Sequence, residues 1–355
     1  MIYETVRTII LEDGTGLGRY VVKHGTVVNT VSVIMPVFNG EKYIEKSINS
    51  VYRQSYSAIE LIIINDGSRD QSSDVLEKML KLAPVHVSVK VFHQDNHGIC
   101  YSRNKALDNA SGKYVMFIDQ DDYMREDCVE TLCHKMESDN ADMVIGGFDL
   151  VDFQGKVLEK WELKPDFPWS KFRITTPWGR IYRKELIDRF HIRFMITKIS
   201  EDLYFNMLYM SYCKKISITT YRGYFWVYNE QSESHAKMSQ MEEDRNPLLM
   251  LTELHHKMNQ PNILEQDCVE YQVVKQVIWY LFYVAKSAEK NAFKAAYQQC
   301  FAWLEQYYPE YIRHIFWRIG FPKGENGKTR SIVKMTLLLK KIGLLPMFLR
   351  IYALK

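Results

Sequence analysis

Three carboxylates lie within four positions of the segment FIDQDD, at Asp119, Asp121 and Asp122. The preceding segment YVMFI (114–118) is apolar or aromatic throughout and predicts a buried strand that ends at this cluster. Neighbouring carboxylates repel one another unless a cation lies between them, and oxygen ligands favour Mg²⁺ or Mn²⁺. Such ions typically keep open positions for phosphate oxygens. The cluster therefore indicates chemistry on a diphosphate, with a solvated turn or a helix N-cap as the alternative.

Apolar segments alternate with helical patterns over the first 120 residues. The strands are predicted at 30–37, 60–65, 87–93 and 114–118, and the helices at about 41–54, 70–82 and 99–110. This alternation indicates an α/β fold with βαβ units, in which a mostly parallel sheet is covered by helices on both faces. Ligands of such sheets bind at the carboxyl ends of the strands, where Asp66 and the acids of 119–122 lie.

The second half of the chain is predicted to be mainly helical. Short strands at 143–148 and 156–163 precede amphipathic stretches around 247–258, 269–287 and 291–307. The polar run HAKMSQMEEDRN (235–246) predicts a boundary between parts of the chain. We therefore expect an N-terminal extension (1–30), an α/β domain (31–236) and a helical region (237–355).

Composition and charge exclude several classes of protein. The 355 residues are 46% hydrophobic and 13% aromatic, which is ample for a core, and a net charge of +3 is too small to indicate a nucleic-acid partner. The six cysteines have no metal-binding spacing and are typical of reduced thiols, so Cys128 and Cys133 are expected as buried thiols. We expect no signal peptide and no membrane-spanning segment, since Lys275 interrupts the longest apolar stretch (273–285).

Four segments in the same order resemble family 2 glycosyltransferases of the GT-A fold. They are SVIMPVFNGEKYIEKSINSVYRQSY, ELIIINDGSRD, DNHGICYSRNKAL and GKYVMFIDQDD, and the match covers roughly residues 31–235. The resemblance implies a Rossmann-like GT-A domain and an inverting enzyme that moves a hexosyl or N-acetylhexosaminyl group from a nucleotide diphosphate. The implied acceptor is a hydroxyl of a surface polysaccharide, a similar glycan or a lipid-linked saccharide.

The resemblance also implies roles for the acids. Asp121 is expected to bind Mn²⁺ or Mg²⁺, and Asp119 to contact the same metal or the ribose or sugar of the donor, with Asp122 in support. Asp66 matches the residue that hydrogen-bonds the donor base, usually uracil, which implies a UDP-sugar. Its alternative is an Asp that stabilises a turn.

Further residues match the donor-binding segments of the family, namely Pro36, Val37, Asn39, Glu41, Asn96, Gly98, Arg103 and Gln120. Arg103 is expected either to contact the base or diphosphate or to form an ion pair with Asp66.

The segment SEDLYF (200–205) resembles the motif that supplies the general base. Asp202 is the first candidate and Glu201 the second. The alternative is a helix N-terminus with two acids in its first turn, and both roles are compatible.

Three more residues have two interpretations each. His235 is a candidate ligand of the metal or phosphate, or a solvated loop residue. Trp178 either stacks on the sugar or belongs to the core. Arg180 lies where relatives often carry a Lys: it either contacts the diphosphate as that Lys does or, because its geometry differs, does not.

The C-terminal tail is basic and amphipathic. Residues 323–355 carry eight Lys or Arg and one acid, Glu325, between many apolar residues. This pattern indicates either a helix on an anionic membrane surface or a helix packed on its own domain or another subunit. The first case predicts a cytoplasmic enzyme, peripheral at the inner face of the cell membrane; the second leaves a homo-oligomer open. Residues 1–30, with GTGLGR (14–19), match no phosphate-loop context.

Two other functions are alternatives to glycosyl transfer. A sugar nucleotidyltransferase needs a glycine-rich loop after the first strand, where this chain has PVFN (36–39). A non-catalytic relative that binds nucleotide sugar, or a partner subunit of a glycosyltransferase complex, is the remaining alternative.

Overall fold

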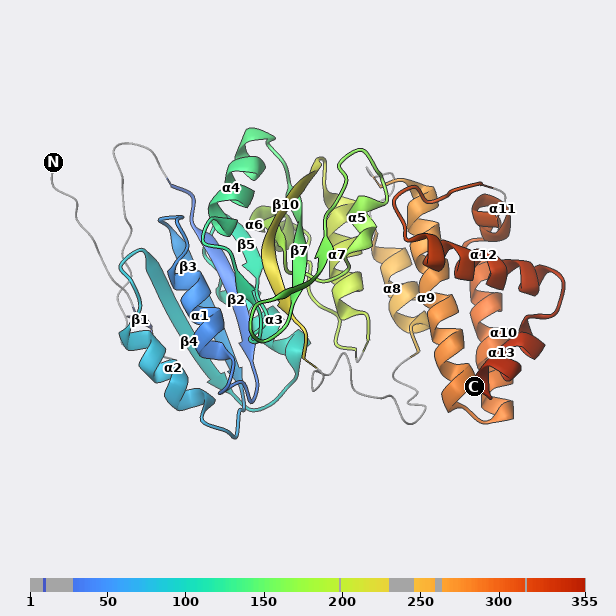
Figure 1. The fold of residues 1–355 in the computed structure, drawn as a ribbon, viewed down its shortest axis with the longest axis horizontal. Helices are drawn as coiled ribbons and strands as arrows, with labels where there is room; N and C mark the ends of the chain where they lie inside the picture. Colours follow the sequence, from blue (N-terminus) through green and yellow to red (C-terminus); the bar gives the residue numbers. More distant parts are fainter. Residues whose placement is uncertain are drawn as a thin grey trace. The chain divides into compact units, whose positions relative to one another are not determined.

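The computed structural model describes residues 9–10, 28–197, 199–229, 246–258, 264–316 and 318–354. The chain divides into two compact units (Figure 1). The first comprises Met1–Leu163, Thr176–Ile196 and Tyr212–Asn229, and the second comprises Lys164–Thr175, Thr197–Ser211 and Glu230–Lys355. The boundary predicted at residues 236–237 lies outside the described residues, and the three-part division stays a prediction.

Four parallel strands form one half of the sheet in the first unit. They are β2 (Val31–Val37), β3 (Ile59–Asp66), β4 (Val87–Gln94) and β5 (Tyr114–Phe117). Strand β2 lies between β3 and β5, with Val33 opposite both Leu61 and Met116. Every residue of β2, β3 and β5 is buried, because helices cover both faces of a parallel sheet. The predicted α/β class with a largely parallel sheet is confirmed.

The other half of the sheet mixes strand directions. It contains β9 (Arg180–Arg183), β7 (Met143–Val151), β10 (Ile216–Val227) and β6 (Tyr123–Met124), in the sheet order β1-β4-β3-β2-β5-β9-β7-β10-β6. Strand β1 (Ile9–Ile10) pairs with β4, and β8 (Val157–Trp161) pairs with β7. Strand β6 pairs antiparallel with Tyr224–Phe225 of β10. The acidic segment 119–122 therefore joins two strands of one sheet, β5 and β6.

Five helices belong to the first unit, among the described residues. They are α1 (Ile44–Tyr52), α2 (Ser72–Lys81), α3 (Ile99–Asn109), α4 (Cys128–Ser138) and α6 (Lys184–Arg189). Helix α3 packs on β2 and β3, and α4 packs on β7, β9 and β10. Helix α1 begins at residue 44 instead of 41, because the amides of residues 43 and 44 first form a turn on the Gly40 carbonyl. Cys128 and Cys133 on α4 are buried free thiols, as predicted.

The described part of the second unit is helical. Its elements are α5 (Ser170–Arg173), α7 (Glu201–Tyr212), α8 (Leu248–Lys257), α9 (Gln266–Ser287), α10 (Lys290–Tyr307), α11 (Tyr311–Phe316), α12 (Gly327–Lys341) and α13 (Leu345–Ala353). The long helix α9 contacts α10, α11, α12 and α13. The helical C-terminal region predicted from the sequence is thus confirmed.

A buried ion pair connects α9 with the loop before α12. Lys275 lies 3.1 Å from Glu325, and the two side chains are only 12% and 8% exposed. Burial lowers the pKa of Lys275, and the charge of Glu325 partly offsets that effect. The Lys275 ammonium also lies 4.6 Å from the Trp169 ring centre, a distance at which the ring face attracts a cation. These contacts explain how a lysine is accommodated within the apolar stretch 273–285.

The described helices were also compared with the requirements of a membrane span. None of them combines the length and the apolar character that crossing a bilayer requires.

Candidate functional site

Four loops at the carboxyl ends of β2, β3, β4 and β5 hold most of the predicted donor-binding residues. Parallel strands place these loops at one edge of the sheet. Side chains from each loop bind the backbone of another, so the edge is a connected network. The contacts are described loop by loop below.

The acidic loop after β5 is organised around Asp122. This carboxylate is 1% exposed and accepts hydrogen bonds from the Tyr224 hydroxyl (2.7 Å) and the Val227 amide (2.8 Å). Both donors belong to β10, about a hundred residues further along the chain. The Ser47 hydroxyl on α1 also donates to the carbonyls of Gln120 and Asp122. Asp122 thus supports the loop through its hydrogen bonds to β10, in line with the supporting role that the family resemblance implied.

Tyr224 connects the two ends of the acidic loop. Its hydroxyl donates to Asp122 and accepts from the Asp119 amide at 3.1 Å. The Trp178 ring stacks on the Tyr224 ring at 4.4 Å with an interplanar angle of 2°, and meets Phe148 edge to face at 5.0 Å. Trp178 is 3% exposed. Of the two interpretations of Trp178, these contacts favour the core position, from which it supports Tyr224.

The electrostatics of the loop leave two of its acids, Asp121 and Asp122, without a compensating cation. Burial raises the pKa of Asp121, and the charge of Asp119 raises it further, although a hydrogen bond from Asn229 acts in the opposite direction. Burial also raises the pKa of Asp122, with contributions from Asp119 and Asp121. No ion pair to Asp121 is found in the described part of the chain. A divalent cation would favour the ionised form of Asp121.

Asp119 and Asp121 fit such a cation as a pair of oxygen ligands. The described residues contain no group of three or more His, Cys, Asp or Glu side chains placed to hold a metal. Two carboxylates completed by phosphate and water oxygens are a common arrangement for Mg²⁺. His235, the third predicted ligand, lies outside the described residues.

Arg103 on α3 forms an ion pair with the acidic loop. Its Nη2 lies 3.0 Å from Asp119 Oδ1, and its side chain is only 2% exposed. The guanidinium also lies 5.1 Å from the Phe194 ring centre. Arg103 was expected to contact the base or diphosphate of the donor or to pair with Asp66; the structure shows an ion pair with Asp119, and a contact with the donor stays a prediction. A single Arg therefore both neutralises Asp119 and fixes its orientation.

Asp66 at the end of β3 binds the loop that follows β4. It is 3% exposed, and it accepts from the His97 amide (2.9 Å), the Gly98 amide (2.8 Å) and the Gln94 side chain (2.6 Å). Gly98 has φ +87°, a conformation that side chains disfavour. A carboxylate offers about four acceptor sites, so one remains for a ligand N–H. The turn-stabilising role is therefore present, and the base-binding role stays a prediction.

The loop after β2 is bound on both sides. Pro36 and Val37 are buried in β2, whereas Asn39 accepts from the Arg69 amide (2.8 Å) and Glu41 accepts from the Gln71 amide (2.9 Å). On the other side, Gln120 exchanges two hydrogen bonds with the Phe38 backbone, at 2.9 and 3.0 Å.

Close backbone approach fixes two further positions of this edge. A Cβ on Gly40 would lie 2.4 Å from Gln120 Oε1, so a side chain at residue 40 would displace the Gln120 amide that binds Phe38. A Cβ on Gly67 would lie 2.7 Å from the backbone nitrogen of Asn96. The Asn96 side chain is exposed at the same edge.

The two candidate bases lie in the second unit. Glu201 and Asp202 are the first two residues of α7, and Ser200 before them has φ +60°. The Asn206 side chain donates to the Asp202 carbonyl at 2.9 Å and to the Thr175 carbonyl at 2.7 Å. The helix N-terminus interpretation is thus correct, and the catalytic role stays a prediction. Arg180 lies in β9 of the first unit and is fully buried.

Sequence reasoning missed three residues that organise this edge. Tyr224 belongs to an aromatic segment outside the motifs, and no sequence pattern marks Ser47 or Asn229. The alternation of aromatic residues at 221–228 was the available signal for Tyr224. Nothing local in the sequence pairs Ser47 with residues 120 and 122.

Removing the Tyr224 hydroxyl tests this description of the loop. Tyr224→Phe should lower the free energy of unfolding by about 1–3 kcal/mol, because buried Asp122 loses a donor. Tyr221→Phe is the matched control. Tyr221 is a half-exposed residue of the same strand, and its hydroxyl donates to Asp127. Urea denaturation measures both, and equal effects would contradict the bridging role.

The raised pKa of Asp121 predicts a pH dependence of stability. When a carboxyl group has a higher pKa in the folded state than in the unfolded state, the protein loses stability as pH rises above the unfolded value of about 3.9. Asp121→Asn, which mimics the protonated form, should therefore raise the free energy of unfolding at pH 7 in metal-free buffer. The gain should shrink as pH falls below about 3.9, because the carboxyl group then becomes protonated in the unfolded state as well. A loss of stability at pH 7 would contradict the burial argument.

Comparisons with known proteins agree with this architecture. The family model described as glycosyl transferase family 2 matches residues 32–204. Glycosyltransferase GlyA of Streptococcus pneumoniae is 30% identical over 200 residues, which are 50% of this chain and 27% of GlyA. Cholesterol galactosyltransferase of Borreliella burgdorferi is 30% identical over 216 residues, which are 55% of this chain and 59% of that protein. The chain thus spans less than two thirds of the length of these relatives.

A solved structure extends the likeness over most of the chain. S. aureus TarS 1–349, in complex with UDP, superposes with a TM-score of 0.63 and 18% identity, covering 88% of this chain and 92% of TarS 1–349. This comparison supports the fold, while the family assignment comes from the match at residues 32–204. On that match, and on the motifs placed at the sheet edge, residues 32–204 form a glycosyl transferase family 2 domain.

Proposed function

We propose that this chain is an inverting glycosyltransferase that moves a sugar from a UDP-sugar to a hydroxyl of a glycan or lipid-linked saccharide. The observation that carries the proposal is the acidic loop, where Asp121 is half-buried beside Asp119 and has a raised pKa. A cation that binds there would also bind the diphosphate of the donor. The family 2 domain and the sugar transferases among the relatives support the same reaction.

The donor diphosphate is held through Asp119 and Asp121. These two residues would bind Mn²⁺ or Mg²⁺, which stabilises negative charge on the departing diphosphate. Arg103 keeps the Asp119 carboxylate oriented, and Tyr224 holds the Asp119 amide. Since these supports are buried, the carboxylates need little reorganisation when the donor binds.

The donor base is recognised by Asp66. Its carboxylate has room for one more donor, and the imide N–H of uracil supplies one. The amides of residues 97 and 98 hold the carboxylate in place. The structural likeness to TarS 1–349, which was solved with UDP, supports the choice of uracil.

Transfer itself requires a base on the acceptor side. We assign this role to Asp202, with Glu201 as the second candidate. The carboxylate removes the proton from the acceptor hydroxyl, whose oxygen attacks the anomeric carbon while the bond to the diphosphate oxygen breaks. UDP leaves, and the configuration at the anomeric carbon inverts.

The acceptor and the location are proposed together. A relative named cholesterol galactosyltransferase supports an acceptor with a lipid part. A lipid-linked saccharide would place this enzyme in the cytoplasm, peripheral at the inner face of the cell membrane. The basic C-terminal helices fit that location.

Binding of UDP with Mn²⁺ tests the donor site. UDP with Mn²⁺ should stabilise the protein by about 2.7 kcal/mol at a hundredfold excess over the dissociation constant. Asp121→Asn should remove the part that depends on Mn²⁺. Thermal unfolding with UDP, dTDP, GDP and CMP, each with and without Mn²⁺, measures this.

Asp166→Asn is the matched control, because Asp166 lies in an exposed loop of the second unit. It should respond to UDP and Mn²⁺ as the natural protein does. An unchanged Mn²⁺ effect in Asp121→Asn would contradict the metal assignment. No shift with any nucleotide would favour a non-catalytic relative or partner subunit.

The base assignment has a separate test. Asp202→Asn should lower the transfer rate by about 10²- to 10⁴-fold, the usual contribution of a general base, while UDP binding stays normal. Glu201→Gln is the comparison at the neighbouring position and should have a smaller effect. Near-normal transfer by Asp202→Asn would transfer the role to Glu201 or to another residue.

A further inference from the structure

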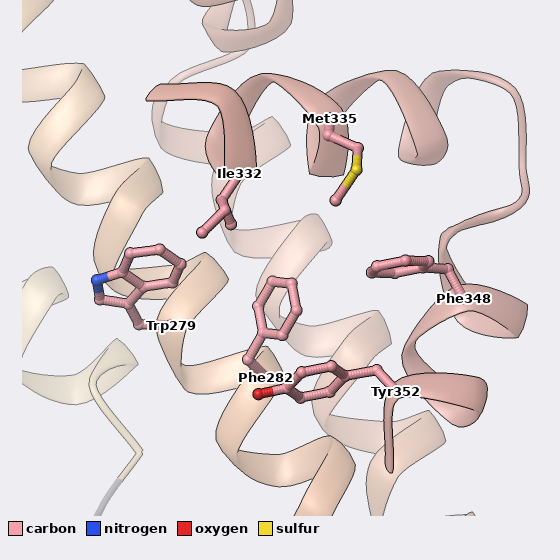
Figure 2. Close-up of a pocket in the computed structure, with 6 residues that line it drawn as sticks. All are labelled: Trp279, Phe282, Ile332, Met335, Phe348 and Tyr352. Carbon is pink, nitrogen blue, oxygen red and sulfur yellow. The ribbon is translucent and has the colours of Figure 1, made fainter. Parts of the chain in front are cut away.

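An open apolar pocket of about 390 Å³ lies among α9, α12 and α13 of the second unit. Figure 2 shows its lining side chains directed toward a common space, with two from each helix: Trp279, Phe282, Ile332, Met335, Phe348 and Tyr352. The Phe282 ring meets the Tyr352 ring edge to face at 4.8 Å. The volume lies within the range of about 300–1,000 Å³ that is usual for small-molecule sites. Its lining has no charged group, so it fits a hydrocarbon ligand.

Exposed apolar side chains continue from the pocket along α12 and α13. Seven of the 21 exposed large apolar residues in the described chain lie between positions 335 and 354. They are 40–88% exposed and comprise Met335, Leu338, Ile342, Leu344, Met347, Ile351 and Leu354. Trp279 in the pocket is 37% exposed. Such a concentration on two consecutive helices is typical of a binding surface.

The charged residues of the same two helices are all basic. Helices α12 and α13 contain no acid and six basic residues, Lys328, Arg330, Lys334, Lys340, Lys341 and Arg350. Lys286 on α9 adds a cation 4.7 Å from the Tyr352 ring centre at the pocket. Lys328 and Arg350 are exposed. The surface therefore combines exposed apolar groups with positive charge.

Internal packing explains only one side of these helices. Val333, Leu337, Leu345 and Leu349 are fully buried and attach α12 and α13 to their own unit. The exposed apolar residues lie at other positions of the same helices. The packing predicted for the tail thus uses one face and leaves the other uncovered.

We propose that the face formed by α9, α12 and α13 docks on the surface of an anionic phospholipid bilayer. The pocket receives a hydrocarbon chain, and the surrounding Lys and Arg side chains meet the headgroup phosphates. A second copy of this face is a poor partner, because α12 and α13 carry cations and no acids, so two copies repel each other there. The inference deepens the proposed membrane location, and does not depend on the chemistry of the sheet edge.

Vesicle binding by the whole chain tests the proposal. The protein should float with vesicles of phosphatidylglycerol and phosphatidylcholine, and float far less with phosphatidylcholine alone or at high salt. Arg350→Glu with Ile351→Ser should weaken binding about tenfold, since one basic residue near such a surface contributes about fivefold (1 kcal/mol) and its reversal adds repulsion. Both side chains are exposed, so the fold should tolerate the change.

Lys81→Glu with Leu82→Ser is the matched control. It makes the same two changes on an exposed basic–apolar pair of the first unit, where Leu82 is 59% exposed against 51% for Ile351. The control should bind vesicles as the natural protein does. Equal weakening by both double variants would overturn the proposal, as would an absence of vesicle binding. UDP binding should be unchanged in both, so failure here is distinguishable from failure of the proposed reaction.

Two further measurements distinguish a bilayer from a second copy of the chain as the partner of this face. Tryptophan emission should shift to the blue on anionic vesicles, and Trp279→Phe should lose most of that shift. In sedimentation experiments, the natural protein should not self-associate through this face. It should therefore behave as the Arg350→Glu, Ile351→Ser variant does. Self-association of that kind would assign the face to a second copy and overturn the proposal.

Discussion

The electrostatic cost of placing three carboxylates, one buried and two half-buried, in one short loop governs the arrangement of the sheet edge. Asp119, Asp121 and Asp122 lie within four residues, and each carboxylate has different partners. Arg103 neutralises Asp119, while Asp122 is solvated by the hydroxyl of Tyr224 and an amide of β10. Asp121 receives only hydrogen bonds, and its pKa is raised. A loop supported in this way is ready for a divalent cation, whose charge completes the compensation.

The long-range connections of the first unit follow from that loop. Strand β10 supplies the groups that hold Asp122, and α1 supplies Ser47 beneath the carbonyls of the loop. The loop after β2 is joined to Gln120, and Asp66 ties the loops after β3 and β4 together. Binding a donor at this edge would therefore act on a network that is already formed, which limits the ordering entropy that binding must overcome.

Much of this fold was predictable from the sequence, because buried parallel strands leave a clear signal. Continuous apolar segments located β2, β3 and β5, and the polar residues directly after them located the edge. Contacts between residues far apart were not predictable: Arg103 pairs with Asp119 instead of Asp66, and Tyr224 reaches Asp122 across 102 positions. Helix α4 and strand β9 were missed: β9 has only four residues, whereas the buried residues of α4, at positions 128, 129, 132, 133 and 136, do follow helical spacing. Charge and amphipathicity left two uses of the tail open; the described helices show the buried face that packs on their own unit, and the membrane surface stays a prediction.

The central claim is that a divalent cation and a nucleoside diphosphate bind together at Asp119 and Asp121. Electron paramagnetic resonance of Mn²⁺ tests it most directly, because the sharp signal of the hydrated ion weakens when the ion binds protein. We predict that protein and UDP together remove far more of this signal than either does alone, and that UMP, which lacks the second phosphate, has a much smaller effect. A signal no weaker with protein and UDP than with UDP alone would contradict the account.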